Sequence, residues 1–175
     1  MPIRIILVDD HTLLREGVAG LLDSHPDMTV VGSFGGGRAA IDFAASHEVD
    51  VAVVDVTIPD MNGIEVVRQL QDVSPHTQVL MLSAYVDPEY VYLALRAGAL
   101  GYIAKDSAGG MLAEAVRTVH AGKRYLCDQA DTEALRHVLT VRGADTPLGR
   151  LSPREREVLQ LTVEGHNIAH TAERL

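Results

Sequence analysis

Short, mostly apolar segments recur along the first two thirds of the chain. They comprise residues 3–8, 28–34, 51–54, 78–82 and 101–104. An apolar segment without polar alternation, such as Val51 to Val54, is typical of a strand buried on both faces in a parallel sheet. We therefore interpret these five segments as strands of one sheet that is covered on both sides.

The stretches between these segments carry hydrophobic residues at helical spacing. In the first, Leu14, Val18 and Leu21 lie on one face. Asp87 and Pro88 supply an N-cap and a Pro at the first helical position, and Gly98 ends that helix. We expect helices over residues 12–24, from the Gly35–Gly37 turn to about 47, and over 64–73, 88–97 and 111–120. The alternation of strand and helix predicts an α/β domain.

Polar side chains follow four of the expected strands. Asp9 and Asp10 follow the first, and the third, fourth and fifth are followed by Asp55, Ser83 and Lys105. Ligands in open α/β sheets bind at the carboxyl ends of the strands. Three carboxylates at one edge would repel one another without a cation, and Mg²⁺ prefers such oxygen ligands. A lysine and a hydroxyl beside them suit the oxygens of a phosphoryl group.

Composition and charge narrow the function classes. The chain has 175 residues, of which 47% are hydrophobic and 22% are charged, as in a globular protein. Residues 1–121 contain 16 acidic and 7 basic residues and so have a net charge of −9, which equals the net charge of the full sequence. No segment has the basic surface of a nucleic-acid-binding domain. No apolar segment approaches the ~18 residues of a membrane span, so we expect a cytoplasmic protein without membrane partners. The single cysteine excludes an internal disulfide.

The last third of the chain has a different pattern. Residues 131–141 could form a connecting helix, and residues 143–149 read as a linker that contains Pro147. Ser152, Pro153 and Glu155 then provide a capping signature for a new helix. We expect three parts: an α/β domain at 1–121, a linker with a helix at 122–150, and a partial helical domain at 151–175.

The first part resembles the receiver domain of bacterial two-component response regulators. The resemblance covers about residues 1–121 and rests on the Asp9–Asp10 pair, Asp55 with the downstream Pro59 and Gly63, Ser83 followed by Ala84, and Lys105. It implies a flavodoxin-like (βα)5 fold with strand order 2-1-3-4-5. It also implies Mg²⁺ as cofactor and a sensor histidine kinase as partner.

The same resemblance implies a role for each site residue. Asp55 would accept the phosphoryl group, and Asp10, Asp55 and the backbone carbonyl of Thr57 would ligate Mg²⁺. Asp9 would support the metal through water. Ser83 and Lys105 would hold the phosphoryl oxygens, with Ala84 beside them. Tyr102 would be the aromatic side chain that moves inward on activation. The implied protein is a switch and not an enzyme, with at most phosphorylation from small donors and self-hydrolysis.

Residues 151–175 look like the first half of the LuxR/NarL-type helix-turn-helix output domain. By that resemblance the protein would control transcription, and would form a homodimer when activated. The sequence given stops before a recognition helix, the element that reads bases in the major groove. We therefore expect no DNA-binding residues in these 175 residues, and DNA binding only through a complete output domain.

Three alternatives compete with this interpretation. One is a stand-alone receiver that acts by protein–protein interaction. A second is an NAD-type dinucleotide-binding domain, because Gly35 to Ala40 fits G-x-G-x-x-A and Asp55 lies 20 residues after Gly35. A third is a magnesium-dependent phosphohydrolase of the haloacid dehalogenase type, which would need an Asp where Thr57 stands. His11 adjoins the acidic pair, and we interpret it as the residue that precedes the first helix.

Overall fold

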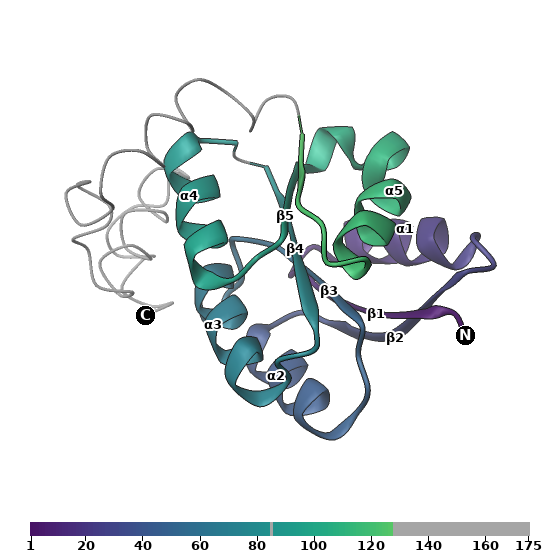
Figure 1. The fold of residues 1–175 in the computed structure, drawn as a ribbon, viewed down its shortest axis with the longest axis horizontal. Helices are drawn as coiled ribbons and strands as arrows, with labels where there is room; N and C mark the ends of the chain where they lie inside the picture. Colours follow the sequence, from purple (N-terminus) through teal and green to yellow (C-terminus); the bar gives the residue numbers. More distant parts are fainter. Residues whose placement is uncertain (85, 128–175) are drawn as a thin grey trace.

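The computed structural model describes residues 1–84 and 86–127. Strands and helices alternate along this part of the chain (Figure 1). The elements are β1 (Ile3–Val8), α1 (Thr12–Asp23), β2 (Met28–Phe34), α2 (Gly37–Ser46), β3 (Val51–Val54), α3 (Gly63–Val73), β4 (Gln78–Ser83), α4 (Pro88–Ala97), β5 (Gly101–Ala104), α5 (Ala108–His120) and β6 (Tyr125–Leu126). The predicted connecting helix, the linker and the segment 151–175 lie outside the described residues.

The fold has three layers around a central parallel sheet. The strand order is β2-β1-β3-β4-β5-β6, and every strand pair is parallel. Helices α2, α3 and α4 lie on one side of the sheet, and α1 and α5 lie on the other (Figure 1). The predicted flavodoxin-like fold and its strand order are confirmed. All four residues of β3 are buried, as expected for a strand covered on both faces.

Two features in the last part of the described residues were not predicted. Helix α5 begins at Ala108, after a 3-10 turn over Lys105–Ser107, whereas the sequence pattern placed its start at Met111. Gly109 and Gly110 weaken the helical signal there, but the side chain of Leu112 is fully buried and fixes the helix on the sheet. The second feature is β6, a two-residue strand that extends the sheet beside β5 and leaves Cys127 buried.

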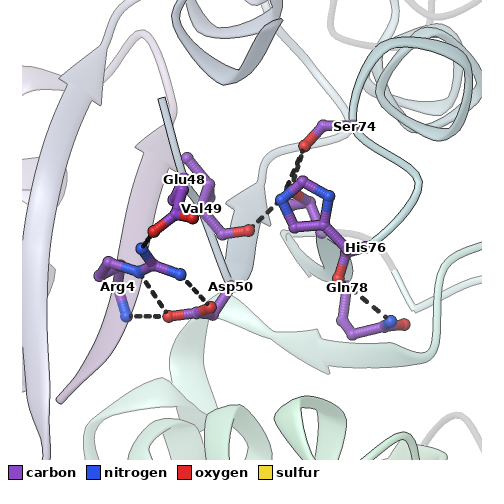
Figure 2. Close-up of polar contacts among 8 residues, drawn as sticks. Arg4, Glu48, Val49, Asp50, Ser74, His76 and Gln78 are labelled. Atoms are coloured by element: carbon purple, nitrogen blue, oxygen red, sulfur yellow. Dashed lines mark hydrogen bonds and ion pairs between the residues drawn. The ribbon is translucent and has the colours of Figure 1, made fainter. Parts of the chain in front are cut away.

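A polar network closes the amino edge of the sheet, opposite the acidic strand ends (Figure 2). Arg4 makes a two-pronged ion pair with Asp50, with N–O distances of 3.0 Å and 2.8 Å, and also contacts Glu48. The Thr77 hydroxyl donates to the carbonyl of Val49 at 2.8 Å. These contacts join the starts of β1, β3 and β4, so the amino edge of the sheet is fixed independently of its carboxyl edge.

The helices of the described part of the chain are all short and amphipathic. None of them has the length and apolar character needed to cross a lipid bilayer.

Candidate functional site

Asp55 lies at the centre of the carboxyl edge of the sheet. It follows β3 directly, and its backbone N–H donates to the carbonyl of Val8 at 2.8 Å. That bond continues the β1–β3 pairing by one residue and draws the side chain into the fold, where only 3% of the residue is exposed. Helix α3 is capped by Asn62 and not by Asp55, because the Oδ1 of Asn62 accepts from the N–H of Ile64 at 2.9 Å.

Lys105 joins the carboxylates of two different strands. Its Nζ lies 2.6 Å from Oδ2 of Asp55 and 2.7 Å from Oδ2 of Asp9. Asp9 follows β1 and is 5% exposed, and Lys105 follows β5. The structure therefore brings together three of the residues that the sequence placed at successive strand ends.

Burial and charge oppose each other at these groups. Burial raises the pKa of Asp55 to about 6, although the ammonium of Lys105 favours the ionised form. Burial of the ammonium works against its charge, but the hydrogen bonds to Asp55 and Asp9 outweigh it and raise the pKa of Lys105. One cation thus makes two buried carboxylates tolerable in the same small volume.

Asp10 and His11 complete an acidic cluster beside Asp55. Ligand atoms of Asp9, Asp10, His11 and Asp55 all lie within 4.8 Å of one another. Three carboxylates at this spacing fit a hard divalent cation such as Mg²⁺. His11 is the N-cap residue of α1, as predicted, and its Nδ1 lies 2.9 Å from Oδ1 of Asp10 and 3.2 Å from Oδ1 of Asp9.

The loop between β3 and α3 is folded tightly on Asp55. Thr57 forms an antiparallel bridge with Asn62, and the N–H of Gly63 donates to the carbonyl of Val56 at 2.8 Å. A Cβ atom on Gly63 would lie 1.9 Å from the backbone carbonyl oxygen of Asp55, which leaves no space for any side chain. Only glycine therefore fits at position 63, because the backbone of Asp55 passes too close for a Cβ atom. Thr57, two positions after Asp55 in the sequence, belongs to this tightly folded loop.

Ser83, Ala84 and Tyr102 lie on the other side of Asp55. Ser83 is the last residue of β4 and is fully buried, whereas Ala84 is exposed. Tyr102 on β5 is also fully buried. Burial raises the pKa of its hydroxyl, and a hydrogen bond with Ser83 acts in the opposite direction. In this structure the Tyr102 side chain is therefore buried and hydrogen-bonded to Ser83.

Two contributors to the site region were missed by sequence reasoning. The guanidinium of Arg15 donates to the backbone carbonyl of Asp9 and, at 2.9 Å, to the hydroxyl of Ser33. Asp60 accepts from the first-turn N–H groups of α2 at Gly37 and Arg38, at 2.8 Å and 2.9 Å. No sequence pattern singled out Arg15. For Asp60 there was an indirect indication: Gly36 has no side chain that could cap α2, so the cap had to come from another segment.

The contacts of Asp60 also bear on the dinucleotide alternative. A pyrophosphate in such a domain binds the N–H groups at the start of the helix after the glycine-rich turn. Those N–H groups are bonded to the carboxylate of Asp60, and Asp55 is paired with Lys105. The N–H groups that would bind a pyrophosphate are therefore occupied by Asp60 of the β3–α3 loop.

Comparison with known families agrees with this geometry. Residues 5–117 match the sequence profile of the response regulator receiver domain. This match spans more than half of the chain and includes Asp9, Asp10, Asp55, Ser83 and Lys105. The chain belongs to the response regulator receiver family.

Relatives of this receiver domain are LuxR/NarL-type response regulators. The chain is 36% identical to the DNA-binding transcriptional activator DevR/DosR of Mycobacterium tuberculosis over 173 residues, which are 99% of this chain and 80% of that protein. It is 36% identical to the nitrate/nitrite response regulator protein NarL of Escherichia coli over 166 residues, or 94% and 76% of the two chains. These relatives are regulatory proteins rather than classical enzymes.

Solved structures give the same assignment for the fold. The signal receiver domain of the NarL response regulator from Mycobacterium tuberculosis superposes with a TM-score of 0.67 at 36% identity, covering 70% of this chain and 98% of that one. A LuxR-family two-component response regulator from Aurantimonas gives a TM-score of 0.74 at 28% identity, covering 79% and 99%. Both structures therefore support a receiver fold for the described part of this chain.

Proposed function

We propose that this receiver domain is a phosphoryl-accepting switch, and that Asp55 accepts the phosphoryl group from a sensor histidine kinase. The supporting observation is the position of a buried carboxylate between an acidic cluster and the ammonium of Lys105. A carboxylate oxygen of Asp55 would attack phosphorus while the phosphorus–nitrogen bond of the phosphohistidine breaks and its electrons return to the imidazole. Charge on the phosphoryl oxygens must be neutralised for this attack.

Mg²⁺ would be held by Asp10, Asp55 and the backbone carbonyl of Thr57, with Asp9 acting through water. When bound, the ion supplies positive charge to the phosphoryl oxygens. The cluster of carboxylates within 4.8 Å supports this assignment. Lys105 would neutralise a further phosphoryl oxygen, since its ammonium already lies 2.6 Å from Asp55.

Ser83 and Tyr102 would transmit the change. Phosphorylation adds about 1.5 to 2 negative charges, which would draw the Ser83 hydroxyl toward the new oxygens. Tyr102 packs against this hydroxyl from the neighbouring strand. A shift of Ser83 would therefore alter the environment of Tyr102 and the surface of α4 and β5. Ala84, the exposed residue that follows Ser83, would lie beside the phosphoryl oxygens.

The output would be control of transcription by a homodimer. The relative DevR/DosR is a DNA-binding transcriptional activator, which supports this output for a complete protein. Leu13 on α1 is 85% exposed and borders an apolar groove of about 440 Å³ between α1 and α5. In a twofold dimer, Leu13 of one copy would enter the groove of the other. Lys105 also lines this groove, which connects it to the phosphoryl site.

The decisive experiment is intact-protein mass spectrometry after incubation with acetyl phosphate and Mg²⁺. We expect one added phosphoryl group on the wild type and none on Asp55→Asn or in the presence of EDTA. Asp23→Asn is a matched control, because this carboxylate lies at the far end of α1 and should leave the adduct unchanged. An adduct on Asp55→Asn would show that another residue is the acceptor.

A further inference from the structure

Asp60 links the β3–α3 loop to the start of α2. Its Oδ1 accepts from the N–H of Gly37 at 2.8 Å, and its Oδ2 accepts from the N–H of Arg38 at 2.9 Å. N–H groups in the first turn of a helix have no partner within the helix. Asp60 is 22 residues away from Arg38 in the sequence, so this cap comes from a different element of the fold.

Helix α2 has no cap of its own. Its N-cap residue is Gly36, which has no side-chain oxygen, whereas α3 and α4 are capped locally by Asn62 and Asp87. The backbone of Gly36 is extended, with φ of −158°, a conformation open to any residue. Backbone conformation therefore does not explain the glycine at this position.

Space for the loop does explain it. A Cβ atom on Gly36 would lie 3.0 Å from the carboxylate atoms of Asp60. A Cβ atom on Gly37 would lie 2.9 Å from Met61 and 2.5 Å from Val66. The two glycines thus admit the tip of the β3–α3 loop, and Asp60 supplies the cap that they cannot.

The anchored loop is the one that carries the site. It begins at Asp55, and its base is closed by the Thr57–Asn62 bridge and by the bond from the Gly63 N–H to the Val56 carbonyl. Asp60 lies at the tip, between the two sides of this bridge. Fixing the tip on α2 restricts the orientation that the Thr57 carbonyl can take.

We propose that Asp60 is a positioning residue for the phosphoryl-accepting site. It contacts neither metal nor phosphoryl group, and it acts by holding the loop in the conformation that binds Mg²⁺. Binding is tighter when the ligand-bearing segment is ordered beforehand, because less conformational freedom is lost on binding. This inference rests on the proposed function, since it assigns Asp60 to the same Mg²⁺ site.

The test separates helix capping from loop anchoring in the full 175-residue chain. In Asp60→Ala, we expect the melting temperature to fall by about 2–5 °C through loss of the cap. We also expect the Mg²⁺ dissociation constant, measured by calorimetry, to rise about 3- to 10-fold, below the range typical of residues that contact metal ligands directly. The initial rate of phosphorylation by acetyl phosphate at subsaturating Mg²⁺ should fall by a similar factor.

A second variant supplies a cap without restoring the anchor. In Gly36→Ser/Asp60→Ala, the serine hydroxyl can cap α2 locally, and the absence of the Asp60 carboxylate leaves room for its Cβ. We expect the melting temperature to return toward that of the wild type while Mg²⁺ binding stays weak. Gly36→Ser alone should destabilise the protein, because its Cβ meets the Asp60 carboxylate.

Asp23→Ala is the matched control for loss of a carboxylate-to-amide bond. Its Oδ1 accepts from the N–H of Val30 at 2.8 Å, at the far end of α1 from the acidic cluster. It should lower the melting temperature and leave Mg²⁺ binding unchanged. Two outcomes would overturn the positioning role and leave the proposed function intact. One is that Asp60→Ala binds Mg²⁺ as tightly as the wild type does. The other is that the double variant regains both its stability and its Mg²⁺ affinity. Failure of the wild type to bind Mg²⁺ would instead overturn the proposed function.

Discussion

The ammonium of Lys105 lies 2.6 Å from the carboxylate of Asp55, although β4 separates the strands that these residues follow. The lysine side chain therefore reaches past β4, the strand whose last residue is Ser83, to meet Asp55. This ion pair defines where an incoming phosphoryl group would find positive charge. It also determines the electrostatic balance of the site before any ligand binds.

Replacing Lys105 by methionine should separate phosphoryl transfer from metal binding. The variant keeps the length of the side chain and removes the charge beside Asp55. We expect the rate of phosphorylation by acetyl phosphate at saturating Mg²⁺ to fall at least about 10-fold, because charge on the phosphoryl oxygens is no longer neutralised. Mg²⁺ binding, measured by calorimetry, should persist, since the three carboxylates remain. An unchanged rate would remove Lys105 from the proposed site.

Replacing Asp55 by asparagine should stabilise the protein in the absence of Mg²⁺. The pKa of about 6 in the folded state exceeds the ~3.9 of an unfolded Asp, so wild-type stability decreases as pH rises from about 4 to about 6. The neutral amide avoids this loss. We expect urea denaturation in EDTA at pH 7.5 to give a free energy of unfolding about 1–3 kcal/mol higher for Asp55→Asn. The gain should disappear near pH 4, and a gain that is equal at both pH values would contradict the argument.

Gly63→Ala should disrupt the fold around the site. The added Cβ would lie 1.9 Å from the backbone carbonyl oxygen of Asp55, and backbone atoms cannot rotate away as a side chain can. We expect a loss of more than about 3 kcal/mol in the free energy of unfolding. Gly20→Ala is the control, because no atom lies within 4 Å of its Cβ position on α1. It should raise the free energy of unfolding by about 0.5–1 kcal/mol.

The ion pair between Asp27 and Arg117 should add a pH-dependent contribution at the surface. The Arg117 guanidinium donates to both carboxylate oxygens, at 2.7 Å and 2.9 Å, and lowers the pKa of Asp27 to about 2. The stabilisation is present above about pH 3.9 and is lost as pH falls through about 2. The difference in urea midpoint between wild type and Asp27→Asn should therefore shrink to about half by pH 3. A difference that grows on acidification would have the wrong sign.

Leu13→Asp should weaken self-association of the phosphorylated protein. The leucine is 85% exposed beside an apolar groove, and a carboxylate placed in the partner's groove would lose its hydration among apolar side chains. The Lys105 ammonium at this groove is already paired with Asp55 and Asp9 and would not compensate the added charge. We expect sedimentation of the acetyl phosphate-treated variant to show a monomer where the wild type shows a dimer. Val73→Asp, on α3, is a control for adding charge at an exposed apolar residue. A dimer of unchanged affinity in Leu13→Asp would place the interface elsewhere.

The sequence determined the elements and the edge at which the site lies. The buried segments and the capping signals predicted five strands and five helices, because hydrophobic periodicity and local capping are properties of neighbouring residues. Placing Asp9, Asp55 and Lys105 at one edge also needed only the direction of parallel strands. The family resemblance supplied the strand order, which periodicity alone does not contain.

Tertiary structure decided the contacts made between distant segments. The cap that Asp60 provides to α2, the bond from Arg15 to Asp9 and the position of β6 beside β5 all join residues whose partners have no fixed spacing in the sequence. The raised pKa of Asp55 likewise results from burial by the surrounding elements. Local sequence therefore determined which segments form strands and helices and which chemical groups follow them. Packing decided which groups are in contact and how far the pKa of each is shifted, because the burial of a group depends on the whole fold.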